Sequence, residues 1–415
     1  MSFKKIKGGV CTPQKFRAAT ASAGIKNPSA TRLDLALLVS DIPCVGSGTF
    51  TTNQVQAAPV RLSKKHIKDG NIRAIFANSG NANACTGEVG TQDAKTTAQH
   101  VAKSLGIKPD QVTLCSTGVI GLPLPMERLL SPVGEMASSL KRSSGTDVSK
   151  AIMTSDTCHK EIAVSFKVGE QTVKIGACAK GAGMICPNMA TMLCFVTTDF
   201  KISKELLDQA VQKAVSGSFN RITIDGDMST NDTVLVLANG AAGNRLPNQK
   251  SQSFSLFQEA LCFVMLEMAK ALVRDGERVT KFVTIDVTGA RNQKDAQKVA
   301  EAVANSALVK ASWNGEDPNW GRIIHAVGYS QAYLKEHKID ILYNGIIACS
   351  NGLQAEVDMS TLRNIAAQPQ FTITINLKLG SATYTVYSSD ISPEYIDFNR
   401  SEYAYWKQAR KDGLI

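Results

Sequence analysis

The sequence predicts a mixed α/β fold in which strands and helices alternate without a regular βαβ repeat. Short apolar runs that end in polar loops, such as residues 72–78, indicate strands. Apolar residues at helical spacing from 203 to 215 indicate a helix that buries one face. Two apolar runs, 162–168 and 171–177, flank Gly169-Glu170 and indicate a hairpin. With 415 residues, the chain is long enough to bury a large core.

The other elements follow in chain order from the same patterns. Gly106 predicts the left-handed cap of one helix, and Ser203 predicts the N-cap of another. The last two strands are expected to form a pair around residues 378–381. The full prediction places strands at 72–78, 111–115, 162–168, 171–177, 192–196, 234–238, 281–287, 371–377 and 382–387, and helices at 92–105, 203–215, 253–273 and 293–304.

Composition excludes several classes of function. Lys and Arg number 46 against 36 Asp and Glu, but no arginine-rich arm accompanies this excess, so we expect no nucleic-acid partner. No apolar run approaches the roughly 18 residues of a membrane span, and no secretory signal opens the chain. The ten cysteines form no Cys-x-x-Cys pair, which predicts free thiols, no metal site and a cytoplasmic protein.

The common catalytic motifs are absent from the sequence, including phosphate loops, dinucleotide fingerprints and serine-hydrolase elbows. The five histidines have no spacing typical of a metal pair, so a histidine-based triad lacks support. What remains is a set of loops rich in Gly, Thr, Asn and Asp. At Thr117-Gly118, backbone N–H groups would suit an oxyanion, although the same residues would also form a tight turn.

The central stretch, residues 180–199, is the most unusual part of the chain. A segment of small residues, Lys180–Gly183, leads through Pro187 to Thr191, which stands just before an apolar run. Cleavage just before this threonine would make it an N-terminal nucleophile. Taken alone, Thr191 could be an ordinary strand residue, Lys180 a solvated cation at a bend, and Glu277 part of a helix stop.

Seven sequence motifs together resemble those of a known family, and the resemblance covers nearly the whole chain. The sequence resembles the ArgJ family of ornithine acetyltransferases, the bifunctional glutamate N-acetyltransferases of arginine biosynthesis. The matching segments are Asn78–Gly87, Ser116–Gly121, Ile152–Thr157, Lys180–Leu193, Phe219–Thr233, Val273–Glu277 and Asp317–Arg322.

The resemblance implies a layered α/β sandwich of the ornithine acetyltransferase/DmpA type and a precursor that cleaves itself between Ala190 and Thr191. Residues 1–190 would form the α chain and 191–415 the β chain, assembled as α2β2. The freed α-amino group of Thr191 titrates near ~7.7–8.0 and would serve as the base for its own hydroxyl group.

The resemblance also implies the reaction and its site. N-acetylornithine would acetylate Thr191, and glutamate would take the acetyl group, without a cofactor; acetyl-CoA is a further candidate donor. Thr117 and Gly118 would form the oxyanion hole. The remaining substrate-binding positions carried over are Thr154, Lys180, Thr191, Glu277 and Asn399.

Two departures from the family pattern leave alternatives open. Arg278-Val279 stands where the family has small residues, and the chain runs on past the family's usual C-terminal threonine. Ser401 and Ala404 are the candidates for that threonine's position. The alternatives are an enzyme that uses only N-acetylornithine as donor, a self-cleaving aminopeptidase or amidase of the same fold, and an uncleaved binding module.

Overall fold

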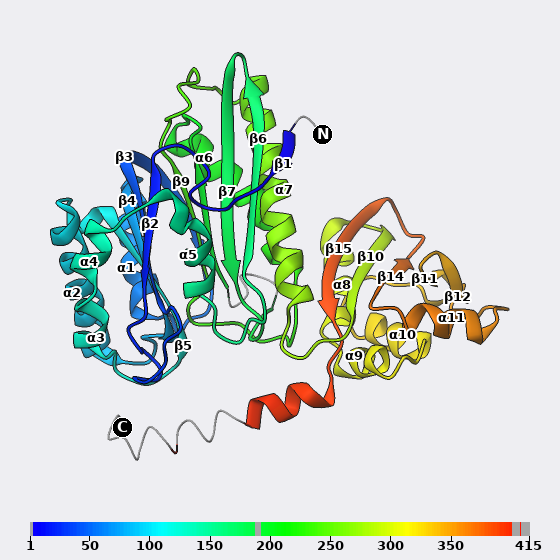
Figure 1. Cartoon of the computed structure of the whole chain (residues 1–415). Helices are drawn as coiled ribbons and strands as arrows, with labels where there is room; N and C mark the ends of the chain where they lie inside the picture. The colour runs from blue at the N-terminus through cyan, green and yellow to red at the C-terminus, as the bar shows by residue number, and fades with distance from the viewer. Residues whose placement is uncertain (1–2, 187–191, 401–406, 408–415) are drawn as a thin grey trace.

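The computed structural model describes residues 3–186, 192–400 and 407. Within these residues, nine strands form one sheet in the order β1-β6-β7-β8-β9-β3-β4-β5, with β2 paired to β3 (Figure 1). The strands of this sheet are β1 Phe3–Ile6, β2 Phe16–Ala21, β3 Leu35–Phe50, β4 Asn71–Asn81, β5 Val112–Val119, β6 Lys160–Val168, β7 Gln171–Lys180, β8 Leu193–Thr198 and β9 Thr233–Ala238.

The long strand β3 folds this sheet into two layers. Its first part, Leu35–Val39, pairs with β4 and also with β2, whereas Val45–Phe50 pairs with β9. The register to β4 shifts between Val39 and Cys44, where a bulge bends the strand. The β2–β5 half therefore lies over the β6–β9 half.

Alternating side chains fill the layers on both sides of each half-sheet. Leu38 and Ile75 from one half meet Phe195 and Leu235 from the other in a core between the sheets. The opposite face of β8 and β9 packs against α6 Lys204–Ser216 and α7 Gln252–Arg274. The opposite face of β3 and β4 packs mainly against α2 Gly87–Leu105. This order of layers is the predicted sandwich.

Four short helices complete this first unit: α1 Ala58–His66, α3 Met126–Leu130, α4 Val133–Ser138 and α5 Gly145–Ala151. In Figure 1, α2, α3 and α4 lie on the outer side of the β2–β5 half, and α7 lies on the side that faces the second unit.

The second unit is a six-stranded sheet with its own core. Its order is β13-β12-β11-β14-β10-β15, and α8 packs on β10 and β15. Trp313 and Tyr343 are its largest fully buried side chains. The elements are β10 Phe282–Ala290, α8 Gln293–Ala304, α9 Ala307–Asn314, α10 Trp320–Gly328, β11 Asp340–Tyr343, β12 Ile346–Ser350, β13 Leu353–Gln354, α11 Met359–Ala366, β14 Gln370–Asn376 and β15 Ala382–Ser389.

Most predicted elements are confirmed, including the β6–β7 hairpin and both caps. The Ser203 hydroxyl group accepts a hydrogen bond from Leu206 N, and Gly106 has the left-handed φ of 65°. Two predictions are wrong. Residues 116–119, expected as a loop, belong to β5, and the last two strands do not pair with each other, because β10 lies between β14 and β15.

Candidate active site

Three strand ends meet near the middle of the first unit. Lys180 ends β7 and pairs with Leu193, which begins β8, and Leu193 pairs in parallel with Thr233 at the start of β9. Since β8 is buried along its whole length, this end of the sheet is held by packing on both faces.

The Lys180 side chain brings two other predicted residues to this point. Its ammonium group donates a hydrogen bond of 2.7 Å to Thr154 Oγ1 and one of 3.3 Å to Thr117 Oγ1. The Lys180 side chain is only 3% exposed, so the ammonium group relies on these partners instead of water. Residues from three distant segments of the chain thus form one polar cluster, which we call the Lys180 cluster: Thr117, Thr154 and Lys180.

Thr117 and Gly118 lie on β5 beside an irregularity in its parallel pairing with β4 at Gly80 and Asn81. Gly118 has a φ of +133°, and a Cβ atom there would lie 2.2 Å from the carbonyl carbon of Gly80. Both the backbone conformation and the close approach of β4 therefore require glycine at this position. The local geometry gives a physical reason for the Thr-Gly pair that the sequence singled out.

A network of amide and hydroxyl groups holds β5 in place behind this pair. The Asn231 side-chain amide donates to the carbonyl oxygens of Ala82 and Ser116, at 2.7 and 2.8 Å. The Ser116 hydroxyl group donates to Asn78 Oδ1 at 2.6 Å. These groups are buried and satisfied, which makes the backbone at Thr117 rigid before any substrate binds.

Glu277 approaches the same region from the end of α7. Its backbone N–H donates to the Ala182 carbonyl oxygen at 2.7 Å. Its carboxylate lies so close to Gly183 that a Cβ atom there would fall 2.5 Å from the carboxyl carbon. The small-residue segment after Lys180 thus accommodates Glu277, and four predicted residues of the site gather around one strand end.

Three further charged residues in this region were not predicted from the sequence: Asp156, Lys160 and Asp275. Lys160 donates to both carboxylates, at 2.7 Å to Asp156, and all three side chains are at most 6% exposed. Burial opposes the ionisation of Asp156, but Lys180, Lys160 and the Gly181 N–H outweigh it and lower the pKa of this carboxyl group to about 2. Asp156 and Asp275 fall in motifs of the resemblance, whereas Lys160, at the start of a strand, gave no signal of burial.

Similarity to known proteins shows to which family the chain belongs. The model of the ArgJ family matches residues 17–404. The chain belongs to the ArgJ family. The arginine biosynthesis bifunctional protein ArgJ of Symbiobacterium thermophilum is 44% identical over 396 residues, which are 95% of this chain and 98% of that protein. The glutamate N-acetyltransferase of Methanocaldococcus jannaschii is 42% identical over 406 residues, at 95% and 98% coverage.

A solved structure, the arginine biosynthesis bifunctional protein ArgJ of Bacillus halodurans, is 35% identical to this chain. It covers 50% of this chain and 98% of its own, with a TM-score of 0.49. The family membership confirms the resemblance found in the sequence.

The predicted cleavage site of this ArgJ chain, Ala190-Thr191, lies outside the described residues, but Met192 is described. Its N–H donates to Asp232 Oδ1 at 3.1 Å, while Asp232 Oδ2 has no hydrogen-bond partner among the residues that the structure describes. Burial raises the pKa of Asp232 well above its usual range, against the opposing effects of the Met192 N–H, Lys180 and the Ser229 side chain. The buried carboxyl group of Asp232 is therefore hydrogen-bonded to the residue that follows Thr191 in the chain.

In the C-terminal part of the predicted site, the described residue Asn399 hydrogen-bonds within its own helix. Asn399 lies on a helix over residues 393–400, and its amide donates to the Tyr395 carbonyl oxygen of the same helix. The Arg278 guanidinium lies over the Phe398 ring, 5.2 Å from its centroid, so the first departure from the family pattern contacts this helix. Ser401 and Ala404 lie outside the described residues.

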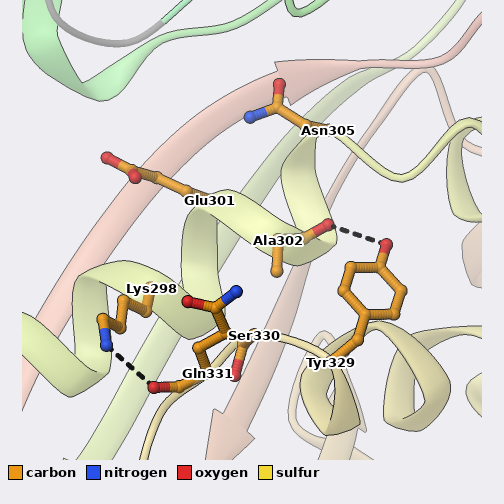
Figure 2. Close-up of a pocket in the computed structure, with 7 residues that line it drawn as sticks. All are labelled: Lys298, Glu301, Ala302, Asn305, Tyr329, Ser330 and Gln331. Atoms are coloured by element: carbon orange, nitrogen blue, oxygen red, sulfur yellow. Dashed lines mark hydrogen bonds between the residues drawn. The ribbon is translucent and has the colours of Figure 1, made fainter.

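A separate cavity of about 370 Å³ lies in the second unit (Figure 2). Its polar groups partly satisfy one another, since Lys298 Nζ donates to the Gln331 carbonyl oxygen at 2.8 Å. No residue that the sequence predicted as catalytic or substrate-binding lines it, so we place the site at the Lys180 cluster. The cavity is lined by Lys298, Glu301, Ala302, Asn305, Tyr329, Ser330 and Gln331.

The described residues contain neither a metal-binding cluster nor a membrane-spanning helix. Among residues 3–186, 192–400 and 407, no group of three or more His, Cys, Asp or Glu side chains is arranged to hold a metal ion. In the same part of the chain, no helix is long and apolar enough to cross a membrane.

Proposed function

We propose that this chain transfers an acetyl group from N-acetylornithine to glutamate through an acetyl ester on Thr191. The observation that carries the proposal is the meeting of Thr117, Thr154 and Lys180, three residues from separate segments of the chain. The names of the two relatives, a bifunctional protein of arginine biosynthesis and a glutamate N-acetyltransferase, supply the reaction class.

In this proposal, the precursor first cleaves itself. The Thr191 hydroxyl group attacks the Ala190 carbonyl carbon, the amide becomes an ester, and water releases Thr191 with a free α-amino group. That group then removes the proton from the Thr191 hydroxyl group during each acetyl transfer, which requires no histidine. Residues 1–190 and 191–415 are the α and β chains.

The polar groups of the site match the charges that this reaction develops. Backbone N–H groups at Thr117-Gly118 would stabilise the oxyanion of each tetrahedral intermediate. The Lys180 ammonium group would bind the substrate carboxylate, and Glu277 would bind an ammonium group of ornithine. Thr154 orients Lys180, and Asn399 would contribute on the acceptor side.

We assign Asp232 as the counter-ion of the new α-ammonium group. Its Oδ2, which has no hydrogen-bond partner among the described residues, would be paired once cleavage creates a cation at the residue before Met192. Asp232→Asn is expected to lower the apparent pKa of the base seen in the pH profile of kcat, because the cation loses its partner. An unchanged profile would rule this assignment out.

One assay separates the proposed function from its alternatives. Purified, cleaved protein is incubated with N-acetylornithine and glutamate, and both products are quantified. We expect ornithine and N-acetylglutamate in equal amounts. Ornithine and acetate without N-acetylglutamate would instead indicate an amidase, and replacing N-acetylornithine by acetyl-CoA tests the second acetyl donor.

The proposal extends to the state of the protein in the cell. All ten cysteines are free thiols, which fits the reducing cytoplasm.

Two α and two β chains would form the active particle. Sedimentation of the cleaved protein measures its mass, and a species with the mass of one precursor would contradict this assembly.

A further inference from the structure

Four buried charges form a network beneath the Lys180 cluster, and the reaction as proposed uses only one of them. The network consists of Asp156, Lys160, Lys180 and Asp275. Their side chains are 0%, 2%, 3% and 6% exposed. Two carboxylates and two ammonium groups balance, so the network carries no net charge while all four are ionised.

Asp156 lies at the centre of this network and uses both oxygens. Oδ1 accepts from Lys160 Nζ at 2.7 Å and from Gly181 N at 2.8 Å. Oδ2 accepts from Thr154 N at 3.1 Å and lies 3.9 Å from Lys180 Nζ. One carboxylate thus fixes the backbone of Thr154 and the backbone that follows Lys180.

The network also reaches Glu277. Asp275 accepts hydrogen bonds from Thr157 N and from Lys160, and it stands two residues before Glu277. Three predicted substrate-binding residues, Thr154, Lys180 and Glu277, are therefore held by groups that do not themselves belong to the predicted site.

We propose that Asp156 is a positioning residue that keeps Lys180 charged and, together with Lys160 and Asp275, aligns it with Thr154 and Glu277 for a substrate carboxylate. This inference rests on the proposed acetyl transfer. Without Asp156, Lys180 would lose the largest influence that opposes its neutralisation, and the backbone after it would lose a hydrogen-bond acceptor.

The groups that face Lys180 determine the direction of this effect. Burial lowers the pKa of Lys180, and the nearby cation Lys160 lowers it further, whereas Asp156, Glu277 and Asp232 raise it. Asp156 is the largest of the opposing influences. Asp156→Asn is therefore expected to lower the Lys180 pKa, and Lys160→Met, which removes a like charge, to raise it.

The pair of variants gives a test that a merely structural role would not pass. The pH profile of kcat/KM for glutamate is measured for the wild type, Asp156→Asn and Lys160→Met. For Asp156→Asn, we expect the alkaline limb to move to lower pH, so that the loss of kcat/KM is larger at pH 8.5 than at pH 6.5. For Lys160→Met, the limb should stay or move to higher pH.

Two results would overturn the inference: an equal loss at every pH for Asp156→Asn, or the same downward shift for both variants. A wild type that transfers no acetyl group would refute the proposed function itself, so the two failures are distinguishable.

A second measurement covers the case in which Asp156→Asn does not cleave itself. The free energy of unfolding is then compared between this variant and the uncleaved Thr191→Ala protein from pH 6.5 to pH 9. The variant should be destabilised most at pH 6.5, the lowest pH of the series, because Lys160 and Lys180 have lost the carboxylate that they share. A difference that does not change with pH would contradict the inference.

Discussion

At the scale of single residues, the site depends on a backbone position that only glycine can occupy. This position is Gly118, because its φ is +133° and Gly80 of β4 lies against it. Asn81, which follows Gly80 in β4, pairs with both Thr117 and Val119, so the pairing of β4 with β5 is irregular here. A side chain at Gly118 would therefore push β5 away from β4 and move the oxyanion donors.

We predict that Gly118→Ala lowers kcat by about 10²–10³-fold, the loss typical of a missing oxyanion donor. Gly134→Ala is the matched control, because Gly134 lies in α4 and a Cβ atom there meets nothing within 4 Å. Steady-state kinetics of both variants decide the point. Equal activities for the two variants would show that the geometry at Gly118 does not serve catalysis.

A buried amine in the second unit leads to a prediction about pH. Lys310 is 4% exposed and donates to the Ser388 hydroxyl group at 3.1 Å. Burial lowers the pKa of Lys310 to about 7 in the folded protein, although Asp390 and Asp225 oppose the shift. Between that value and the ordinary lysine pKa of ~10.4, the unfolded chain binds a proton that the folded chain does not. Stability therefore increases with pH across this window, and below about pH 7 the cost of charging Lys310 is fully present.

Replacing this amine should remove that dependence. For Lys310→Met, the free energy of unfolding is expected to rise less between pH 7 and pH 9 than it does for the wild type, by up to about 1.4 kcal/mol per pH unit. Denaturant titrations at three pH values measure the difference. Parallel curves for the two proteins would mean that Lys310 is already charged in the folded state.

At the scale of elements, the C-terminal helix over residues 393–400 contacts Arg278, where this chain departs from the family pattern. Arg278 has a φ of +55° and places its guanidinium over Phe398, and its carbonyl oxygen accepts from the Ser392 hydroxyl group. Tyr395 in the same helix donates to Asp225 at 3.3 Å. Asp225 also accepts from the backbone of Met184 and Ile185. These contacts connect the helix that carries Asn399 to the segment after Lys180.

We expect Arg278→Ala to weaken this docking and to raise KM for glutamate about two- to fivefold, in line with a cation–π contact of ~0.5–1 kcal/mol. kcat should change little, because Arg278 does not contact the reacting groups of the proposed mechanism. Arg278→Lys keeps a cation over the ring and is the control. If kcat falls while KM stays constant, Arg278 has a different role.

At the scale of the whole molecule, local sequence patterns predicted nine of the 15 strands β1–β15 and four of the 11 helices α1–α11, but not the pairing that assembles them. The helix at 203–215 and the hairpin of β6 and β7 carry their own signals, namely a capping serine and a two-residue turn. The pairing of β14 and β15 was mispredicted because the turn-like residues 378–381 suggest a hairpin. In the fold, β10, from nearly 90 residues earlier, lies between them. The pairing of β10 with β14 and β15 depends on burial within the core of the second unit, which no local sequence pattern predicts.

The same distinction applies to the site. Thr117, Gly118, Lys180 and Glu277 stand in motifs and were predicted, and the structure brings them to one strand end. Asp156 and Lys160 were missed as functional residues, since two charges four apart usually indicate a solvated surface. Their burial is a consequence of how the segment 154–160 passes beneath Lys180. That path depends on contacts between residues far apart in the chain.

The central claim is that cleavage creates the nucleophile and that the nucleophile carries the acetyl group. Intact-mass spectrometry of the protein after incubation with N-acetylornithine, without glutamate, tests both parts at once. The account predicts two chains, residues 1–190 and 191–415, with one acetyl group on the second chain that disappears when glutamate is added. An uncleaved chain, or a cleaved chain that never gains the acetyl group, would contradict the account.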